Sequence, residues 1–179
     1  MSRGAAARVG TGAATGLTSP RTKRKQQAAR AWRATLLATT PEAEFASGWF
    51  DGSAQPNPGR IGLGAVLVTQ RGQRVELSLA SGVGDSNVAE YLALIGLLEL
   101  AHQQRVRRLI VHGDTQIVLQ DVAATAPAPI AALQAYRQRA QHLLQRFDEV
   151  RFCWLPRERN QVADALARTA RQSATSMPE

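Results

Sequence analysis

The sequence predicts an α/β fold built on one mixed β-sheet. Two observations predict it. Three short apolar runs follow one another with turn-forming residues between them, and helical and strand-like segments then alternate to the end of the chain. The first pattern is typical of an antiparallel meander, and the second brings later strands into the same sheet through helical crossovers. A length of 179 residues suits a single hydrophobic core.

The meander comes from apolar runs at about 45–51, 61–69 and 73–81. The segments between them, GSAQPNPG and QRG, are rich in residues that favour turns, so each connection can close a hairpin. The first run stops at a single acid, Asp51, and we expect the first strand to end there.

A long helix follows at 86–104, with Ser86 or Asn87 as its cap. The remaining pattern predicts a buried strand at 106–114, a short helix at 115–123, a proline-rich break at 124–129, an amphipathic helix at 129–147, a strand at 149–156 and a closing helix at 159–172. The predicted order is therefore βββαβααβα.

The net charge of +8 is concentrated at the N-terminus. Residues 1–41 hold eight Lys or Arg and no acid, whereas 42–179 hold 14 basic and 14 acidic residues. The arm's composition buries too little apolar surface to offset chain entropy, so we predict a disordered basic arm over 1–43, with room for a short helix at 26–38, and a folded domain over 44–175. A solvated tail, an organelle transit segment and a phosphate-binding arm remain open as its role.

Several classes of protein are excluded by composition. No apolar stretch approaches the roughly 18–20 residues of a membrane span, so we expect no membrane partner. The single cysteine, Cys153, excludes an internal disulfide, and three scattered histidines do not have zinc-ligand spacing. The single cysteine fits a reducing cytoplasm, and we expect a cytoplasmic protein that is a monomer.

Four carboxylates occupy unusual places: Asp51 at a strand end, Glu90 near a helix start, Asp114 at a strand-to-helix junction and Asp164 in a helix with small neighbours. Glu90 is the only charged residue from Val88 to Leu98, in a helix apolar on nearly every side, where an isolated charge is very costly. Each acid also has an ordinary explanation: a turn residue, a favourable charge at a helix N-terminus, an N-cap and a solvent-facing acid, respectively.

Taken together, the four acids suggest one site. Clustered carboxylates without histidine or thiolate partners suit Mg²⁺ or Mn²⁺ rather than zinc. Two such ions about 4 Å apart can hold a phosphodiester for in-line attack by water. The sequence therefore predicts phosphoryl transfer.

The motifs FDGS…NPG…G.GAVL, NVAEYLALI, GDTQIVL and RERNQVADALA resemble, in order and spacing, those of ribonuclease H type 1. The resemblance covers about 45–173. It implies a ribonuclease H-like fold, a five-stranded mixed sheet of strand order 3-2-1-4-5 flanked by helices. It also implies a metal-dependent endonuclease that hydrolyses the RNA strand of RNA–DNA hybrids, leaving 5′-phosphate and 3′-hydroxyl ends.

By this resemblance, Asp51 bridges two Mg²⁺ ions, for which Mn²⁺ can substitute, and Glu90, Asp114 and Asp164 complete the ligands. The family's contacts to the hybrid fall, in this chain, on Gly52, Ser53, Asn57, Asn87 and Gln116. The amides among them would contact ribose 2′-hydroxyls, which distinguish RNA from DNA. Asn57 is also explained as a turn residue, and Asn87 as a helix cap.

Two departures from the family pattern stand out. Many members carry a histidine in the loop before the final aspartate, but here the loop is the short PRERN, and Arg157 is our candidate for its role. Arg159 could equally be a phosphate contact or an exposed charge. The family's basic protrusion is also missing, because no Lys or Arg occurs between Arg108 and Arg137. Another nuclease on the same fold, or a catalytically silent hybrid-binding module, is the alternative.

Overall fold

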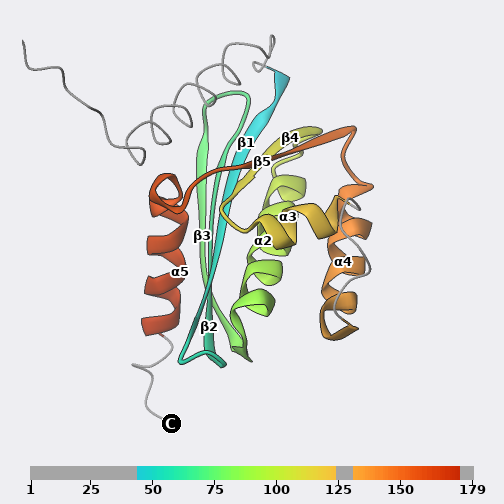
Figure 1. The fold of residues 1–179 in the computed structure, drawn as a ribbon. Coiled ribbons are helices and arrows are strands. Elements are labelled where there is room, and N and C mark those ends of the chain that lie inside the picture. The colour runs from blue at the N-terminus through green and yellow to red at the C-terminus, as the bar shows by residue number, and fades with distance from the viewer. Residues whose placement is uncertain (1–43, 124–130, 174–179) are drawn as a thin grey trace, which may run out of the picture. The chain divides into compact units, whose positions relative to one another are not determined.

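The computed structural model describes residues 44–123 and 131–173 (Figure 1). Within them the strands and longer helices follow the predicted order βββαβααβα. The arm predicted over 1–43, its helix at 26–38 and the proline-rich break at 124–129 lie outside the described residues. The predicted boundary between arm and domain therefore stays a prediction.

The strands are β1 (Ala46–Gln55), β2 (Gly59–Val68), β3 (Arg74–Gly84), β4 (Arg108–Gly113) and β5 (Glu149–Trp154). The helices are α2 (Ser86–Gln103), α3 (Gln116–Val122), α4 (Gln134–Leu144) and α5 (Gln161–Ser173), with short 3₁₀ turns η2 (Ala131–Leu133) and η3 (Arg157–Arg159). The sheet order β3-β2-β1-β4-β5 is the one expected. β1, β2 and β3 pair antiparallel, while β4 joins β1 and β5 joins β4 in parallel.

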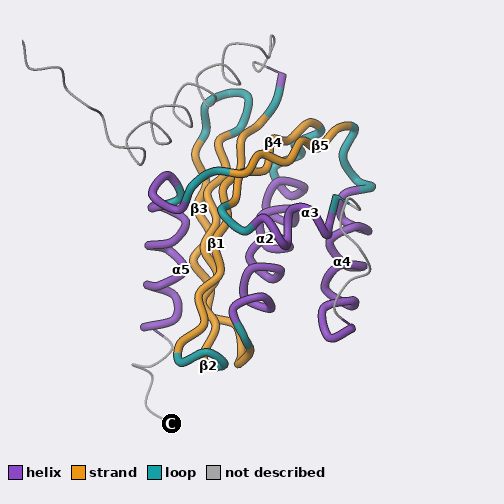
Figure 2. Tube along the Cα trace, in the orientation of Figure 1, coloured by secondary structure: helices purple, strands orange, loops and turns teal. Residues whose placement is uncertain are grey.

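Helices cover both faces of the sheet. α5 lies on one face and α2 on the other, with α3 and α4 beyond α2 (Figures 1 and 2). α2 is apolar on nearly every side because it is enclosed between the sheet and its helical neighbours, and Leu94, Leu97 and Leu98 are fully buried. Among the described residues, no helix combines the length and the apolar character needed to cross a membrane.

The α5 backbone rests directly on β2. A Cβ atom added at Gly62 would lie 2.0 Å from the Ala167 carbonyl oxygen, and one at Gly64 would lie 2.1 Å from the Ala163 carbonyl oxygen. Only glycine permits this approach. The small residues of α5 and the glycines of β2 therefore belong to one packing interface.

The expectation that β1 ends at Asp51 is wrong. β1 continues to Gln55 and stays paired with β2, Asp51 opposite Gly64 and Gln55 opposite Arg60. Gly52 allows the continuation, because a Cβ there would lie 2.2 Å from the Ala89 carbonyl carbon in α2. Gly52, a residue type common in turns, here allows α2 to pass close to β1. Asp51 therefore lies within a strand and is not a turn residue.

The cap of α2 also differs from the prediction. Asp85, rather than Ser86 or Asn87, caps the helix, and its Oδ1 accepts a hydrogen bond from the Val88 amide at 2.9 Å. The helix begins one residue earlier than a Ser86 cap requires, so the capping position moves to Asp85. α4 is also shorter than the predicted 129–147, because its start is preceded by the 3₁₀ turn η2.

Candidate active site

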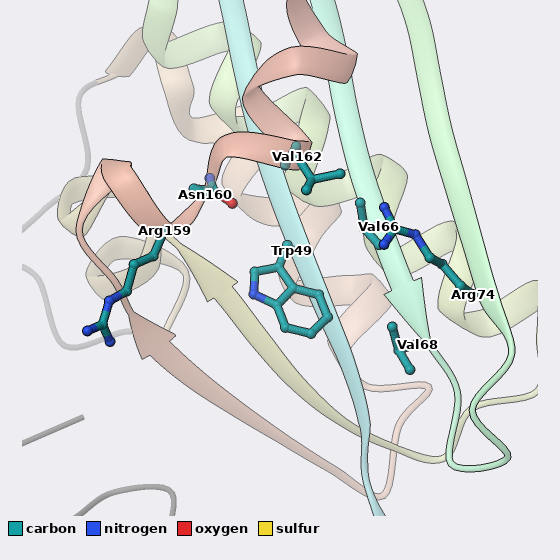
Figure 3. A pocket seen from close by; sticks show the side chains of 8 residues that line it. Trp49, Val66, Val68, Arg74, Arg159, Asn160 and Val162 are labelled. Atoms are coloured by element: carbon teal, nitrogen blue, oxygen red, sulfur yellow. The ribbon is translucent and has the colours of Figure 1, made fainter. Parts of the chain in front are cut away.

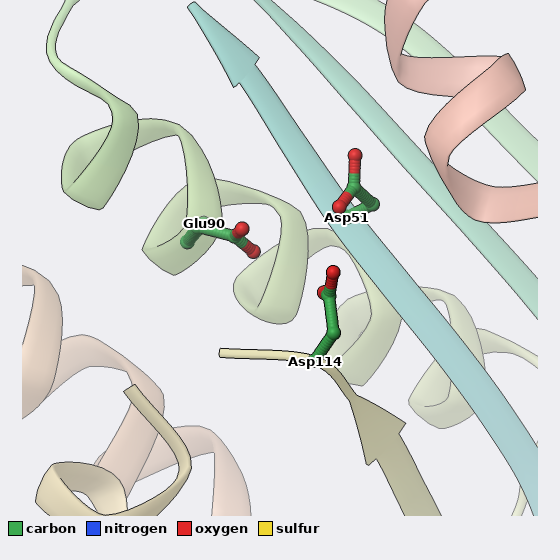
Figure 4. A group of neighbouring side chains, drawn as sticks. All are labelled: Asp51, Glu90 and Asp114. Carbon is green, nitrogen blue, oxygen red and sulfur yellow. The ribbon is translucent and has the colours of Figure 1, made fainter. Parts of the chain in front are cut away.

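Three acids that are far apart in the sequence meet beside the middle of β1, just past the end of β4. Asp51 comes from β1, Glu90 from the second turn of α2, and Asp114 from the residue after β4. One carboxylate oxygen from each lies within 4.8 Å of the others, and the side chains converge (Figure 4). Thr115, not Asp114, occupies the N-cap position of α3, so the capping explanation of Asp114 is wrong.

These carboxylates are held where negative charge is costly. Burial raises the pKa of Asp51 to about 7, and the charges of Asp114 and Asp164 add to the rise. Burial, followed by the charges of Asp51 and Asp114, raises the pKa of Glu90 well above its usual range, against the lowering effect of a hydrogen bond from the Gly52 amide. The cluster is an electrostatically unfavourable arrangement for the protein alone.

The same cluster has the properties of a divalent-cation site. The buried Oε2 of Glu90 has no hydrogen-bond partner among the described residues. Unpaired buried oxygens are rare, and a cation would satisfy this one and offset the mutual repulsion of the acids. The donors are all oxygens, which fits Mg²⁺ or Mn²⁺.

Asp164 is set apart from this group. It lies in the first turn of α5 and is 7% exposed, so the explanation as a solvent-facing acid is wrong. Arg157 Nη2 donates to its Oδ1 at 3.2 Å, and Arg168 Nη2 donates to its Oδ2. The structure thus brings three predicted acids together and holds the fourth nearby on two guanidinium groups.

Arg157 begins η3, and its side chain is 75% exposed. Its positive charge lowers the pKa of Asp51 and of Glu90, which places it within the electrostatic reach of the cluster. Its role in place of the family histidine stays a prediction. Arg159 lies at the other end of η3 and lines a separate hollow.

That hollow, of about 290 Å³, is shown in Figure 3, and none of the four predicted acids lines it. Trp49 forms its centre and stacks on His112 with ring centroids 4.8 Å apart. Its walls are Val66, Val68, Val162 and Ala163, with Arg74, Arg159 and Asn160. This lining is mainly apolar, whereas a metal site needs oxygen ligands. The hollow is therefore separate from the carboxylate cluster.

The predicted substrate contacts on β1 lie next to the cluster. Gly52 follows Asp51 and donates its amide to Glu90. Ser53 lies two residues beyond Asp51, on the same face of the strand, and is half-buried. Gly52 and Ser53 therefore both lie at the edge of the carboxylate cluster.

The three predicted amide contacts lie on loops and helix starts around the cluster. Asn57 is exposed in the β1–β2 turn, and its Oδ1 accepts from the Ser86 amide at 3.1 Å, so it ties that turn to the start of α2. Asn87 lies half-buried in the first turn of α2, and Gln116 is exposed as the first residue of α3. Their contacts to a substrate stay predictions.

Asn160 is a site residue that the sequence analysis did not single out. It is 2% exposed, and its Nδ2 donates to the Phe50 carbonyl at 2.8 Å and to Asp114 Oδ1 at 3.2 Å. It therefore joins α5 to β1 and to the acid after β4. The sequence could have indicated Asn160 by its position, because it lies four residues before Asp164 at the start of a predicted helix. Arg168, four residues after Asp164, could have been found from helical spacing.

Comparison with known proteins identifies the family. A family model described as reverse transcriptase-like matches residues 49–170. The crystal structure of RNase H1 from the archaeon Halobacterium salinarum is 35% identical, with a TM-score of 0.68, and the match covers 72% of this chain and 98% of that chain. The chain belongs to the ribonuclease H type 1 family.

Two other ribonuclease H structures share this fold. The N-terminal RNase H domain of Rv2228c from Mycobacterium tuberculosis is 31% identical with a TM-score of 0.67, covering 70% of this chain and 98% of that one. LC11-RNase H1, solved in complex with an RNA/DNA hybrid, is 28% identical with a TM-score of 0.68. The match covers 73% of this chain and 99% of that chain. These similarities confirm the ribonuclease H fold.

Two curated relatives extend well beyond the matched region. Ribonuclease HI of H. salinarum is 36% identical over 127 residues, and the match covers 64% of its length. For the bifunctional protein Rv2228c the match, 33% identical, covers 35% of its length.

Proposed function

We propose that this protein is a ribonuclease H that hydrolyses the RNA strand of RNA–DNA hybrids. The observation that carries the proposal is the convergence of Asp51, Glu90 and Asp114 within 4.8 Å, on a ribonuclease H fold. The capture of an RNA/DNA hybrid by LC11-RNase H1 supports the substrate class.

The acids would hold two Mg²⁺ ions, with Mn²⁺ as a substitute. Asp51, Glu90 and Asp114 would hold them together with Asp164, with Asp51 as the principal ligand. When bound, the ions would activate a water molecule and stabilise the leaving 3′-oxygen, giving 5′-phosphate and 3′-hydroxyl ends. The chain's own contribution is orientation: the Gly52 amide holds Glu90, and the Asn160 amide holds Asp114.

Recognition of the hybrid would fall to the residues around the acids. Asn57, Asn87 and Gln116 present amides that suit ribose 2′-hydroxyls, and Gly52 and Ser53 present backbone and hydroxyl groups along β1. Arg157, beside Asp164, would take the place of the family histidine by binding the released phosphate, since a guanidinium stays charged and does not transfer protons at neutral pH.

The decisive experiment is cleavage of a labelled RNA–DNA hybrid beside matched single-stranded RNA, double-stranded RNA and duplex DNA. Each substrate is tested with Mg²⁺, with EDTA and with the Asp51→Asn variant. Asp148→Asn is the control, because Asp148 is an exposed acid paired with Arg107 outside the cluster. We expect hybrid-only, Mg²⁺-dependent cleavage that Asp51→Asn abolishes and Asp148→Asn retains.

The other outcomes point to the alternatives. Hybrid binding without cleavage under any divalent cation would indicate a silent binding module. Cleavage of duplex DNA would indicate another nuclease on the same fold.

A further inference from the structure

Arg168 has an environment that neither the family resemblance nor the proposed mechanism explains. It lies one helical turn after Asp164 on α5, and its side chain is 56% exposed, whereas that of Asp164 is 10% exposed. Arg157 takes the other oxygen of the same carboxylate. Two guanidinium groups therefore neutralise the one acid that is not within the three-acid group.

A divalent cation at Asp164 would compete with these guanidinium groups for the same two oxygens. A guanidinium remains charged at any relevant pH, so proton loss cannot relieve the repulsion between it and a metal ion. The arginine must move instead. Arg168 can do so because its side chain is long and exposed, whereas Asp164 is fixed by the close packing of α5 on β2.

The space beside Arg168 holds two guanidinium groups together with the carboxylates of Glu158 and Asp164, so it offers donors to an anion once a cation has neutralised Asp164. An open hollow of about 530 Å³ lies over this part of α5, lined by Arg157, Glu158, Gln161, Asp164, Ala165 and Arg168. Two guanidinium groups and one amide offer hydrogen-bond donors, which is the chemistry that recognises a phosphodiester. If a cation binds the two carboxylate oxygens of Asp164, the guanidinium groups of both arginines lose that partner, and their N–H donors become available to another acceptor.

We propose that Arg168 is an exchangeable phosphate ligand. It neutralises Asp164 in the metal-free protein, and it binds a backbone phosphate of the nucleic acid once a divalent cation engages Asp164. This inference rests on the proposed function, because it assumes that Asp164 is a metal ligand and that the substrate is a nucleic acid. Arg168 as an ordinary helical ion pair, by contrast, would affect folding but neither metal affinity nor phosphate binding.

The first test measures metal binding without nucleic acid, by calorimetric titration with Ca²⁺. Arg168→Gln removes the competing charge, so we expect the weaker Ca²⁺ site to tighten by about threefold or more. Arg139→Gln is the matched control: Arg139, on α4, is 58% exposed and pairs with Glu99 of α2 at 2.7 Å. An unchanged Ca²⁺ affinity in Arg168→Gln would overturn the competition with the cation.

The second test measures binding of a hybrid by fluorescence anisotropy, in EDTA and in Ca²⁺, over a range of salt concentrations, on samples verified by gel to be uncleaved. Each phosphate contact contributes about 0.9 to the slope of log K against log salt. In Ca²⁺ we expect Arg168→Gln to lower the slope by about 0.9, and in EDTA to leave it unchanged. Equal effects in the two conditions would overturn the exchange.

Two further measurements keep the result interpretable. Arg168→Lys keeps the charge but loses the planar fork of donors, so it should fall between wild type and Arg168→Gln in both tests. Thermal unfolding of each variant reports folding separately. Wild-type cleavage of the hybrid in Mg²⁺ tests the proposed function independently, so its failure is distinguishable from the failure of this inference.

Discussion

The Asp51 carboxylate is 4% exposed and shares its surroundings with other acids, so its charge destabilises the metal-free fold. Its pKa rises from 3.8 to about 7 on folding. Between about pH 4 and pH 7 the folded protein therefore binds more protons at this site than the unfolded chain. The contribution of Asp51 to the free energy of unfolding falls as pH rises through that window.

We therefore expect Asp51→Asn to stabilise the metal-free protein at pH 8 by about 1–3 kcal/mol, or roughly 3–9 °C in Tm, while abolishing metal-dependent activity. Thermal unfolding in EDTA at pH 4 and pH 8 is the measurement, and the difference between variant and wild type should be small at pH 4. Asp148→Asn should show no such gain. A variant less stable than wild type at pH 8 would contradict the proposed cost of the buried charge.

Asn160 is the residue whose loss should affect the fold and the acids together. Asn160→Ala removes the donor to the Phe50 carbonyl and to Asp114. Leaving a buried carbonyl unpaired costs about 1–3 kcal/mol. We expect a loss of stability of that size and a several-fold weaker affinity for Mn²⁺, measured by thermal unfolding and by titration.

The isosteric variant Asn160→Asp is a second test of the same two contacts. It keeps the shape but places a carboxylate against the Phe50 carbonyl and Asp114, so it should be at least as harmful as Asn160→Ala. A fully active, fully stable Asn160→Ala protein would show that other contacts hold Asp114 in place.

At the scale of elements, local pattern predicted the order of strands and helices but not every boundary. The apolar runs bounded by turn formers and the long apolar helix are strong local signals, and they were confirmed. β1 was predicted too short because Gly52 is a frequent turn residue, while its actual environment is the backbone of α2. A contact between distant segments decided that boundary, and local propensity does not contain it.

The contact of α5 with β2 gives the sharpest prediction at this scale. Gly64→Ala places a Cβ 2.1 Å from the Ala163 carbonyl oxygen, so α5 must move away from the sheet. We expect a loss of about 2–4 kcal/mol and weaker Mn²⁺ binding, because Asp164 lies next to Ala163. Chemical denaturation and Mn²⁺ titration check both.

Gly96→Ala is the matched control. Its Cβ would meet only the end of the Leu77 side chain, at 2.7 Å, which can rotate away, and alanine favours a helix interior by about 1 kcal/mol. It should therefore be nearly neutral. Equal losses for the two substitutions would mean that the α5 contact is less rigid than its geometry indicates.

The site was partly predictable for the same physical reason. Glu90 could be found because a lone charge in an apolar helix requires an explanation, and Asp114 because it follows a buried strand. The grouping of three acids with the fourth held by arginines could not be predicted. It depends on side-chain partners from different elements, Arg157 from η3 and Arg168 from α5.

For the whole molecule, the distribution of charge gives a further prediction. The chain has balanced charge after residue 41 and lacks the basic protrusion, whereas residues 1–41 carry eight basic residues. We expect deletion of 1–41 to weaken hybrid binding and to lower the salt slope by about 2 or more, with metal affinity unchanged. Anisotropy over a salt series is the measurement.

A second variant tests whether charge or length matters. Replacing the eight basic residues of the arm with Gln keeps its length and should reproduce the deletion. An unchanged salt slope in the deletion would show that the arm does not bind phosphates, and would leave targeting or an inert tail as its role.

The dependence of the site on α5 has a consequence for a chain that is still being synthesised. Asp51, Glu90 and Asp114 can meet once β1, α2 and β4 have left the ribosome, but Asp164 and its arginine Arg168 lie in the last described helix, fifty residues after Asp114. A nascent chain therefore carries an incomplete set of these four carboxylates until α5 has left the ribosome. On the proposed mechanism, in which Asp164 is the fourth ligand, the metal site cannot be completed before that helix emerges.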